Sequence, residues 1–396
     1  MKIDLEVQHL CTEYLRGIPY YILNLAENLV RRENNEYSIS FFDYKGERGN
    51  RRYIQKYVDE ALLEKLSIHE CQDLSYRTIM DSNVNGDASE YDEKSYQEYM
   101  SSDADITHFT QSLYIPLNIR GKAIVTVHDV IPLLPTARKY CLENSIKAFK
   151  NAMRYLEENE DIEIISDSLA TKKDIVKYTS ISEDRIHVVP LAYDKAIHYP
   201  EKNEEILKKY NIDGDYILYL GVMDSRKGIL EILEAFDMLK ETYTNLKLVL
   251  AGQIHTIPFE NGELLGDIIK RQKNIDDIIL TGFVSNDEKR ALLSSAMCFM
   301  FPSEYEGFGL PVLEAMACGA PVVTTDVSSI PEVGGDAAKY ITPGNAKELA
   351  NAVKELLDSK ELRDTCIQNG FKQVEKFSWD KTAELTEEVY LKVYSR

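Results

Sequence analysis

Residues 306–323 read EGFGLPVLEAMACGAPVV and contain two glutamates on either side of a glycine-spaced turn. A strand-like run, CFMFP at 298–302, stands before it, and a second β-rich run, PVVTT at 321–325, comes after it. Between them we expect a helix that begins at Leu310, because the proline that follows is favoured in a first helical turn, and that ends at Gly319. Strand, glycine turn, helix and strand in this order are typical of parallel sheets covered by helices.

Glycines and acids at the start of this helix indicate a ligand. The glycines allow backbone angles that other residues resist, so the N–H groups of Phe308, Gly309 and Leu310 can face an anion at the positive end of the helix dipole. When ionised, Glu306 and Glu314 only accept hydrogen bonds, so they require hydroxyl groups. A nucleotide sugar, with a diphosphate between two hydroxyl-rich groups, meets both needs. The alternative is that both are surface acids near a helix start, where acids are favoured.

A pair of cations supports the ligand interpretation. Arg226 and Lys227 follow the strand-like run YILYLG at 216–221 and precede a helical pattern. Two cations at this place oppose the helix dipole, so helix stability alone does not favour them. A bound phosphate would explain the pair, and a solvated turn is the plainer alternative.

His128 follows the strand-like run AIVTV at 123–127, and ligands of parallel sheets bind beyond such strand ends. A lone histidine is more often a hydrogen-bonded structural group, and the pair with Asp129 is too little for a metal. DxD strings occur at 103–105 and 213–215, but both precede strands, so we interpret them as turns and caps. No metal site is predicted.

The same alternation of strands and helical patterns runs through the whole chain, which predicts an α/β protein. The expected strands cover 2–7, 38–43, 105–109, 123–127, 162–165 and 186–190 in the first half, and 216–221, 247–252, 278–283, 298–302 and 321–325 in the second. A charged segment at 194–214 without strand character separates the halves. The last segment begins with a cap at Ser378 and places Leu385, Val389 and Val393 on one apolar stripe, which needs a surface to cover.

Composition excludes several classes of protein. The chain has 396 residues and a net charge of −20, so its field repels nucleic acids and anionic membranes, and at most a peripheral membrane contact is expected. The 6 cysteines are scattered without metal-ligand spacing and indicate a reducing compartment. Charges near the N-terminus interrupt any signal-peptide core, and no apolar run is long enough to span a bilayer. We therefore expect a soluble, cytoplasmic protein.

At this point a family resemblance is evident. Residues 216–335 resemble the retaining glycosyltransferases of family 4, which use nucleotide sugars and have the GT-B fold. The E-x7-E motif stands as Glu306 and Glu314 within PSEYEGFGLPVLEAMACGAPVVTTDVSSIPEVGGDAA. Supporting matches are LYLGVMDSRKGI, LVLAG, TGFVSNDEKRALLSSA, TVHDVIPL and SDSLATKKDI. The chain is most similar to bacterial mannosyltransferase-like members.

This resemblance implies two Rossmann-like domains that face each other across a cleft. Residues 1–195 would be the acceptor-side domain, joined by a C-terminal helix at 379–396 that crosses back to it. Residues 196–378 would bind the nucleotide sugar. The co-substrate would be a GDP- or UDP-sugar without a further cofactor, and the acceptor a glycan or a lipid-linked saccharide.

The resemblance also implies residue roles. Glu306 would face the hydroxyls of the transferred sugar, helped by backbone N–H groups at 308–310, and Glu314 would accept from the ribose. The two cations at 226 and 227 would hold the diphosphate, Val284 would lie by the base, and His128 would lie over the sugar near the reaction centre. The glycine-rich turn after the first strand differs from the family pattern, since RGIPYY keeps Gly17 but has proline in place of the second glycine, so any phosphate contact there is limited to Gly17.

The resemblance implies retention of configuration, and without a metal motif the cations and the helix start must stabilise the leaving diphosphate. Since no carboxylate nucleophile is evident, we expect a front-face displacement in which His128 orients the donor. A nucleotide-sugar epimerase, a non-catalytic nucleotide-sugar-binding protein and a glycosidase remain alternatives. A glycosidase would share the two carboxylates but would need no phosphate turn, and a dehydrogenase is disfavoured because no G-x-G-x-x-G follows the first strand.

Overall fold

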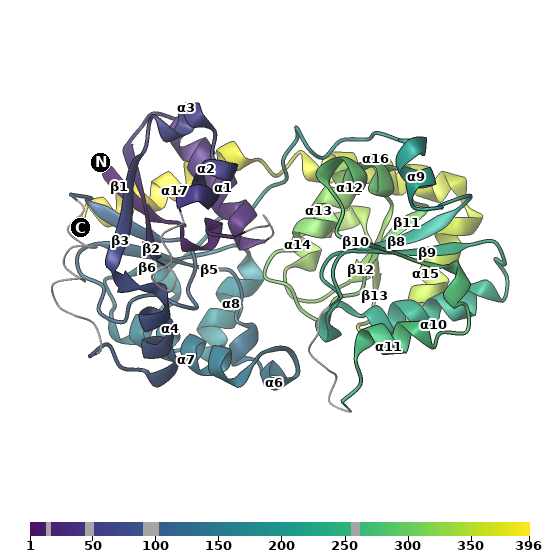
Figure 1. Cartoon of the computed structure of the whole chain (residues 1–396), viewed down its shortest axis with the longest axis horizontal. Coiled ribbons are helices and arrows are strands. Elements are labelled where there is room, and N and C mark those ends of the chain that lie inside the picture. The colour runs from purple at the N-terminus through teal and green to yellow at the C-terminus, as the bar shows by residue number, and fades with distance from the viewer. Residues whose placement is uncertain (13–16, 44–50, 90–102, 255–261) are drawn as a thin grey trace. The chain divides into compact units, whose positions relative to one another are not determined.

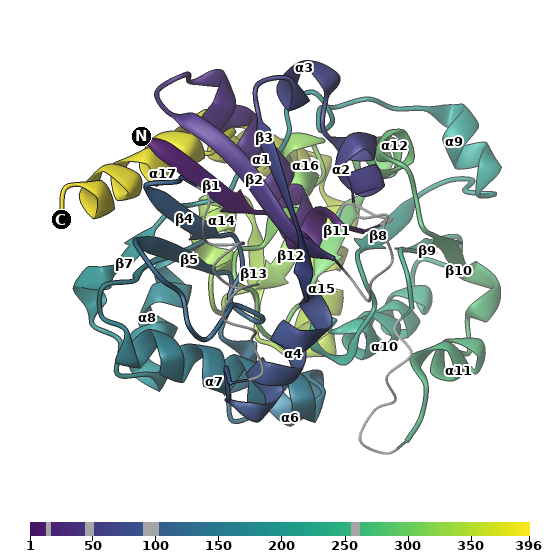
Figure 2. The same ribbon diagram turned by 60° about the vertical axis from the view of Figure 1, so that its left-hand side comes forward.

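The computed structural model describes residues 1–12, 17–43, 51–89, 103–254 and 262–396. The chain divides into two compact units, the first formed by Met1–Leu191 with Ser378–Arg396 and the second by Ala192–Phe377. Each unit has one parallel sheet with helices on both faces (Figures 1 and 2). Of the expected RGIPYY turn, Arg16 lies outside the described residues.

The first unit contains a seven-stranded sheet in the order β3-β2-β1-β4-β5-β6-β7. Its strands are β1 (Lys2–Glu6), β2 (Glu36–Asp43), β3 (Ser67–Ser75), β4 (Ile106–Phe109), β5 (Ala123–Val127), β6 (Glu163–Ser166) and β7 (Ile186–Val188). Its helices are α1 (Ile18–Arg31), α2 (Arg51–Tyr57), α3 (Glu60–Leu63), α4 (Tyr76–Asn85), α6 (Ala137–Tyr140), α7 (Glu143–Glu158), α8 (Leu169–Tyr178) and α17 (Trp379–Tyr394).

The second unit contains a six-stranded sheet in the order β10-β9-β8-β11-β12-β13. Its strands are β8 (Tyr216–Leu220), β9 (Lys247–Ala251), β10 (Ile278–Gly282), β11 (Cys298–Phe301), β12 (Val322–Thr325) and β13 (Lys339–Ile341). Its helices are α9 (Glu204–Lys209), α10 (Ile229–Lys240), α11 (Leu265–Lys270), α12 (Asn286–Ser295), α13 (Leu310–Ala317), α14 (Ile330–Gly334), α15 (Ala346–Asp358) and α16 (Lys360–Val374).

Every predicted strand is present, with its ends moved by at most about two residues, as expected for such boundaries. Two strands were missed, β3 and β13, and both lie at an edge of their sheet. The opposite edge strands, β7 and β10, were predicted, so edge position alone does not explain the misses; β3 has a mostly polar sequence, SIHECQDLS, and β13 has only 3 residues. The predicted helix start at Leu310 is confirmed.

The C-terminal helix α17 belongs to the first unit, where it packs against α1. The Ser378 hydroxyl accepts a hydrogen bond from the Lys381 backbone N–H, which confirms the predicted cap. Val389 and Val393 are buried as predicted, whereas Leu385 is only half-buried. The apolar stripe therefore finds its surface on the first unit, although the chain reaches it only after the whole second unit.

The strand order places particular strand ends side by side. In the second unit the order reverses between β8 and β11, which pair in parallel with Ile217 opposite Cys298 and Leu218 opposite Phe299. Loops that leave the carboxyl ends of these two strands therefore meet, although about 80 residues separate them in the chain. This switch point is where open parallel sheets bind ligands.

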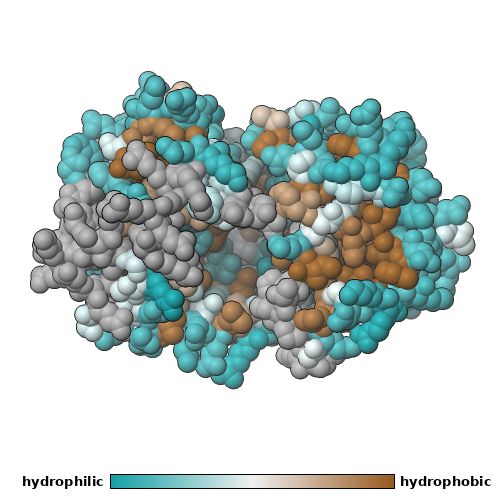
Figure 3. All heavy atoms as spheres, in the orientation of Figure 1, coloured by the Kyte–Doolittle hydropathy of each residue, from teal (hydrophilic) through white to brown (hydrophobic). Residues whose placement is uncertain are grey.

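Apolar side chains gather on the face of the second unit drawn in Figure 3. Leu280 of the edge strand β10 and Phe283, which directly follows that strand, are among the exposed large apolar residues of this unit. None of the helices that the structure describes combines the length and the apolar composition needed to cross a membrane.

Candidate functional site

The candidate site lies at the switch point of the second unit, beyond β8 and β11. After β8 the chain forms a short 3-10 turn, Ser225–Lys227, in which the Arg226 backbone N–H donates to the Asp224 side chain. After β11 it forms the loop that carries Glu306. The Glu304 backbone N–H donates to the Arg226 carbonyl oxygen at 2.8 Å, so the two loops are joined directly.

Glu306 receives several donors on one oxygen. Its Oε1 accepts from Arg226 Nη1 at 2.9 Å, from Lys227 Nζ at 2.5 Å and from Ser303 Oγ at 2.5 Å. Arg226 also donates to the Tyr305 carbonyl oxygen. Oε2 of Glu306 accepts no hydrogen bond from a described residue, and it is not among the fully buried polar atoms. One oxygen is thus held by the protein and the other is open to a ligand.

The charges at this site are buried but not balanced. The Glu306 side chain is 11% exposed, and burial would raise its pKa, but Arg226 and Lys227 outweigh burial and lower it. Burial lowers the pKa of Lys227, against the opposing effect of Glu306, and its ammonium lies 4.9 Å from the centre of the Phe301 ring. With Glu306 ionised and both cations charged, these three side chains keep one positive charge in excess, which favours an anion, although the nearby Asp224 carboxylate offsets part of it.

Backbone geometry makes this close approach possible. Gly228 has a φ of 67°, and a Cβ atom at this position would overlap the Pro302 carbonyl oxygen. Any other residue here would push the Arg226 turn away from the loop of Glu306. The glycine after the cation pair is therefore required by packing rather than by the helix that follows.

Serine side chains hold the Glu306 loop. Ser329 Oγ donates to the carbonyl oxygens of Glu306 at 2.9 Å and Phe308 at 2.8 Å. Ser328, which has an unusual φ of 50°, accepts from the Glu306 backbone N–H at 2.9 Å. The carbonyl groups are thereby turned into the protein, and the loop leads into α13 with a left-handed Gly309 at its N-cap.

The predicted backbone donors occupy the expected place at the start of α13. Leu310 is its first residue, and Gly309 precedes it with a φ of 109°. The Phe308 side chain is buried against Phe377, with ring centres 5.8 Å apart, so only its backbone can serve a ligand. The helix begins four residues after Glu306, the carboxylate that both cations contact, so its first N–H groups can serve an anion there.

Glu314 lies within α13 and is nearly buried. Its Oε1 is 2.9 Å from Lys289 Nζ, which comes from α12, and 3.4 Å from His198 Nε2. Burial would raise the pKa of Glu314, but Lys289 and then His198 outweigh it and lower the pKa. Glu314 is therefore ionised at neutral pH and, like Glu306, has one oxygen occupied by basic groups.

In the first unit His128 follows β5 and lies beside the ends of β4 and β6. Its Nδ1 is 2.8 Å from Asp167 Oδ2 and its Nε2 is 2.9 Å from the Thr110 carbonyl oxygen. Both partners are acceptors, so both ring nitrogens carry protons. Burial would lower the pKa of His128, but the Asp167 carboxylate outweighs it and raises the pKa. His128 is an imidazolium and has no free nitrogen to act as a base.

Two further predicted site residues are Gly17 in the first unit and Val284 in the second unit. Gly17 precedes α1 with a φ of 50°, and Pro19 lies in the first turn of that helix. Val284 follows the edge strand β10 and is half-buried. Their predicted contacts with phosphate and base stay predictions.

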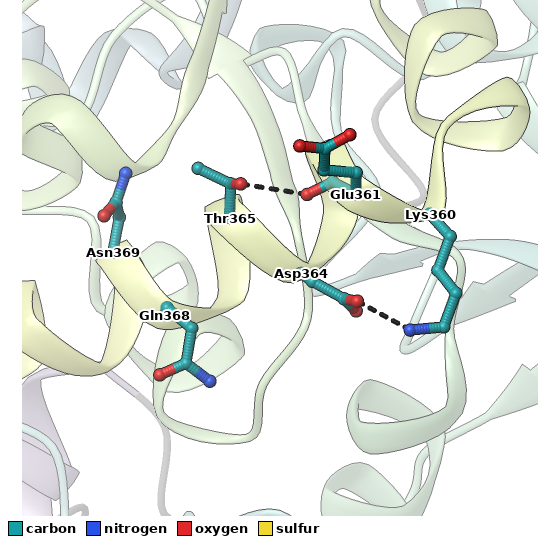
Figure 4. A pocket seen from close by; sticks show the side chains of 6 residues that line it. All are labelled: Lys360, Glu361, Asp364, Thr365, Gln368 and Asn369. Atoms are coloured by element: carbon teal, nitrogen blue, oxygen red, sulfur yellow. Dashed lines mark hydrogen bonds and ion pairs between the residues drawn. The ribbon is translucent and has the colours of Figure 1, made fainter.

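The second unit also has a hollow that none of the predicted site residues lines. It measures about 510 Å³ and lies along α16, lined by Lys360, Glu361, Asp364, Thr365, Gln368 and Asn369 (Figure 4). Its polar groups bond to one another, with Lys360 Nζ 2.6 Å from Asp364 Oδ2 and Thr365 Oγ1 2.9 Å from the Glu361 carbonyl oxygen. Across the described ranges, no group of three or more His, Cys, Asp or Glu residues has the arrangement of a metal site.

Several residues of the site escaped the sequence reasoning. Ser303, Lys289, His198 and Asp167 contact the predicted residues but belong to no spacing that indicates chemistry. Ser303 carried a usable signal, because a serine that directly follows a buried strand stands next to the ligand-binding edge of the sheet. Lys289, His198 and Asp167 contact residues that are distant in the sequence, so no local pattern could indicate them.

The family match found by comparison with known proteins lies in the second unit. The model of the family described as glycosyl transferases group 1 matches residues 202–373. The serotype-specific mannosyltransferase WbdA of Escherichia coli is 30% identical over 281 residues, which cover 70% of this chain but only 34% of WbdA. The O-antigen chain mannosyltransferase B of Escherichia coli is 28% identical over 290 residues, which cover 72% of this chain and 74% of that protein.

Among solved structures, sucrose-phosphate synthase from Thermosynechococcus elongatus superimposes with a TM-score of 0.75 at 17% identity, covering 100% of this chain and 99% of that one. At this identity the likeness shows the fold, and it confirms the predicted GT-B class with its two Rossmann-like domains. The model of glycosyl transferases group 1 thus matches the part of the chain that carries the cation pair and both glutamates.

Proposed function

We propose that the protein is a glycosyltransferase that moves a sugar from a nucleotide-sugar donor to a hydroxyl group of a saccharide acceptor. The observation that carries this proposal is the convergence of Arg226 and Lys227 on one oxygen of Glu306, beside the start of α13. The arrangement offers an excess positive charge for a diphosphate and an open carboxylate oxygen for a hydroxyl group. The family match of residues 202–373 supports it.

In this proposal the diphosphate lies between the cation pair and the backbone N–H groups at the start of α13. Oε2 of Glu306 accepts from a hydroxyl of the transferred sugar, and Glu314 accepts from the ribose. Val284 lies by the base, and Gly17 approaches a phosphate. His128 contacts the sugar as a hydrogen-bonded cation and not as a base, because both of its ring nitrogens already donate.

The reaction breaks the bond between the anomeric carbon and the phosphate oxygen and forms a bond from that carbon to the acceptor oxygen. Arg226 and Lys227 stabilise the negative charge that develops on the leaving diphosphate, which a metal ion does in other enzymes. The acceptor hydroxyl gives its proton to the leaving phosphate oxygen on the same face. This path retains the anomeric configuration, as family 4 membership would require.

The transferred sugar is proposed to be mannose, because the matched relatives from Escherichia coli are named mannosyltransferases. The acceptor is a glycan or a lipid-linked saccharide of polysaccharide biosynthesis. A net charge of −20 disfavours nucleic acid and limits any membrane contact to the periphery. A cytoplasmic location remains part of this proposal.

The test begins with thermal unfolding in the presence of UDP-, GDP- and ADP-sugars, since a ligand that binds only the folded state raises Tm by mass action. The donor that raises Tm most is then incubated with mono- and oligosaccharides, and products are separated by mass. We expect a glycoside whose formation requires acceptor. An altered donor without acceptor would indicate an epimerase instead, and binding without turnover on any saccharide would indicate a non-catalytic protein.

A further inference from the structure

Lys289 faces Glu314 from a neighbouring helix. It lies near the N-terminal end of α12, whose dipole disfavours a cation, so the stability of that helix does not account for it. Its Nζ is 2.9 Å from Glu314 Oε1, and the two side chains are only 16% and 10% exposed. A carboxylate this buried without a counter-charge would be costly, so the pair is a condition for an ionised Glu314.

The two oxygens of Glu314 have different surroundings. Lys289 and His198 both approach Oε1. Oε2 accepts no hydrogen bond from the described residues, and it is not a fully buried atom. The ion pair therefore fixes the carboxylate with one oxygen turned inward and the other left for a hydroxyl group.

We propose that Lys289 is a positioning residue for nucleotide binding, which keeps Glu314 ionised and directs its Oε2 toward a ribose hydroxyl. This rests on the proposed function, in which Glu314 binds the ribose. Lys289 acts through Glu314 and does not itself touch the nucleotide.

The groups around Glu314 define the expected pH dependence. His198 donates from Nδ1 to the Asp194 carbonyl oxygen at 3.2 Å, and burial lowers its pKa, so it is neutral near pH 7. Cys318 also lies close and stays protonated because burial raises its pKa to about 12. The charge of Arg290 is matched by Glu201 and Asp287. Lys289 is then the partner of Glu314 that is charged near pH 7, and His198 adds a positive charge only where it is protonated, at lower pH.

The lowered pKa of Glu314 determines on which side of the pH range nucleotide affinity is lost. The pKa of Glu314 is lowered in the folded protein, so its carboxylate is present above that pKa and nucleotide affinity is lost as pH falls through it. Removing the Lys289 charge takes away the largest effect that opposes burial, so the pKa of Glu314 rises. The acid limb, which is the pH range over which nucleotide affinity is lost, then moves toward neutral pH.

The experiment titrates UDP and GDP calorimetrically into the full-length protein between about pH 4 and 7, because the lowered pKa of Glu314 places the acid limb below the ordinary carboxyl value of 4.5. For Lys289→Met we expect a loss of about tenfold in affinity at the acid end and an acid limb moved upward by about one pH unit. Lys289→Arg should restore the limb. The control is Lys209→Met, which removes the ion-pair partner of Glu288, another residue of α12. It should leave the acid limb of nucleotide affinity unchanged.

A double-mutant cycle separates positioning from contact. In a Glu314→Gln background no carboxylate remains to be ionised, so Lys289→Met should change affinity by less than about twofold. An equal loss in both backgrounds, or a loss that is uniform across pH, would overturn the proposal, because Lys289 would then contact the nucleotide itself or only support the fold. If the unmodified protein binds neither UDP nor GDP, the proposed function fails first, and the two failures are thus distinguished.

Discussion

The two units bury charge at the carboxyl ends of their strands in different ways. In the second unit Glu306 and Glu314 each have one oxygen held by basic groups and one that accepts nothing from the described residues. In the first unit both nitrogens of His128 are engaged by protein acceptors, and the spare oxygen, Asp167 Oδ1, is shut away from solvent. An open carboxylate oxygen offers a ligand a hydrogen-bond acceptor, whereas both nitrogens of His128 are already used by the protein, so only its positive charge is left for a ligand.

The largest effect is expected from replacing the cation pair of the second unit. Replacing both Arg226 and Lys227 by Ala should lower kcat/KM with the nucleotide sugar by about a thousandfold or more, since each group stabilises the leaving charge by about 2 to 4 kcal/mol. Steady-state kinetics with the donor found by thermal shift measure the loss. The matched control Lys208→Ala with Lys209→Ala removes two exposed cations of α9 in the same unit, and near-normal turnover is expected from it. Comparable rates in both double variants would refute the phosphate role.

Breaking the ion pair of the first unit should instead affect stability. Asp167→Asn leaves the buried His128 imidazolium without its counter-charge and should lower the free energy of unfolding by about 3 kcal/mol at pH 6. The pKa of His128 is raised in the folded protein, so the contribution is present at low pH and is lost as pH rises through that pKa. Urea unfolding across pH measures both effects.

The control for this variant is Asp380→Asn, which removes an ion pair with Arg32 at the same distance of 2.8 Å but with the aspartate 74% exposed. It should cost less than about 1 kcal/mol, because solvent screens the pair. An Asp167→Asn protein as stable as this control would mean that His128 is neutral in the folded state.

A smaller effect is expected from Ser303, which holds Glu306 in position. Ser303→Ala removes the hydroxyl that donates to Glu306 Oε1 at 2.5 Å, and kcat/KM should fall by about tenfold with little change in Tm. Thr325→Val is the control, because Thr325 Oγ1 bonds the Ser303 carbonyl oxygen at 2.6 Å and not the carboxylate. Equal losses in both variants would place the effect in the loop and not in the Glu306 side chain.

The smallest effect is expected from metal removal. In our proposal Arg226 and Lys227 supply the positive charge at the leaving diphosphate, so EDTA should leave the initial rate of transfer unchanged. The assay compares rates before and after dialysis against EDTA, and then after Mg²⁺ or Mn²⁺ is added back. A rate that disappears with EDTA and returns with the metal would contradict the proposed mechanism.

Much of the fold was predictable because the central strands are short apolar runs between turn residues. Every strand predicted in this way is present. The missed strands are β3, which has a mostly polar sequence, and β13, which has only 3 residues. The helix start at Leu310 was also predictable, since glycine and proline restrict the backbone locally.

Local features could be inferred from the sequence alone: the apolar strands, the helix that begins at Leu310, and the charged residues Arg226, Lys227, Glu306 and Glu314. Which of these charged residues contact one another became clear only from the folded structure. Arg226 and Glu306 meet because β8 and β11 are neighbours in the sheet. Lys289 reaches Glu314 because α12 packs on β8 and α13 packs on β11, the neighbouring strand. The physical reason is that parallel strands bring distant loops to one edge, and no spacing along the chain records that order.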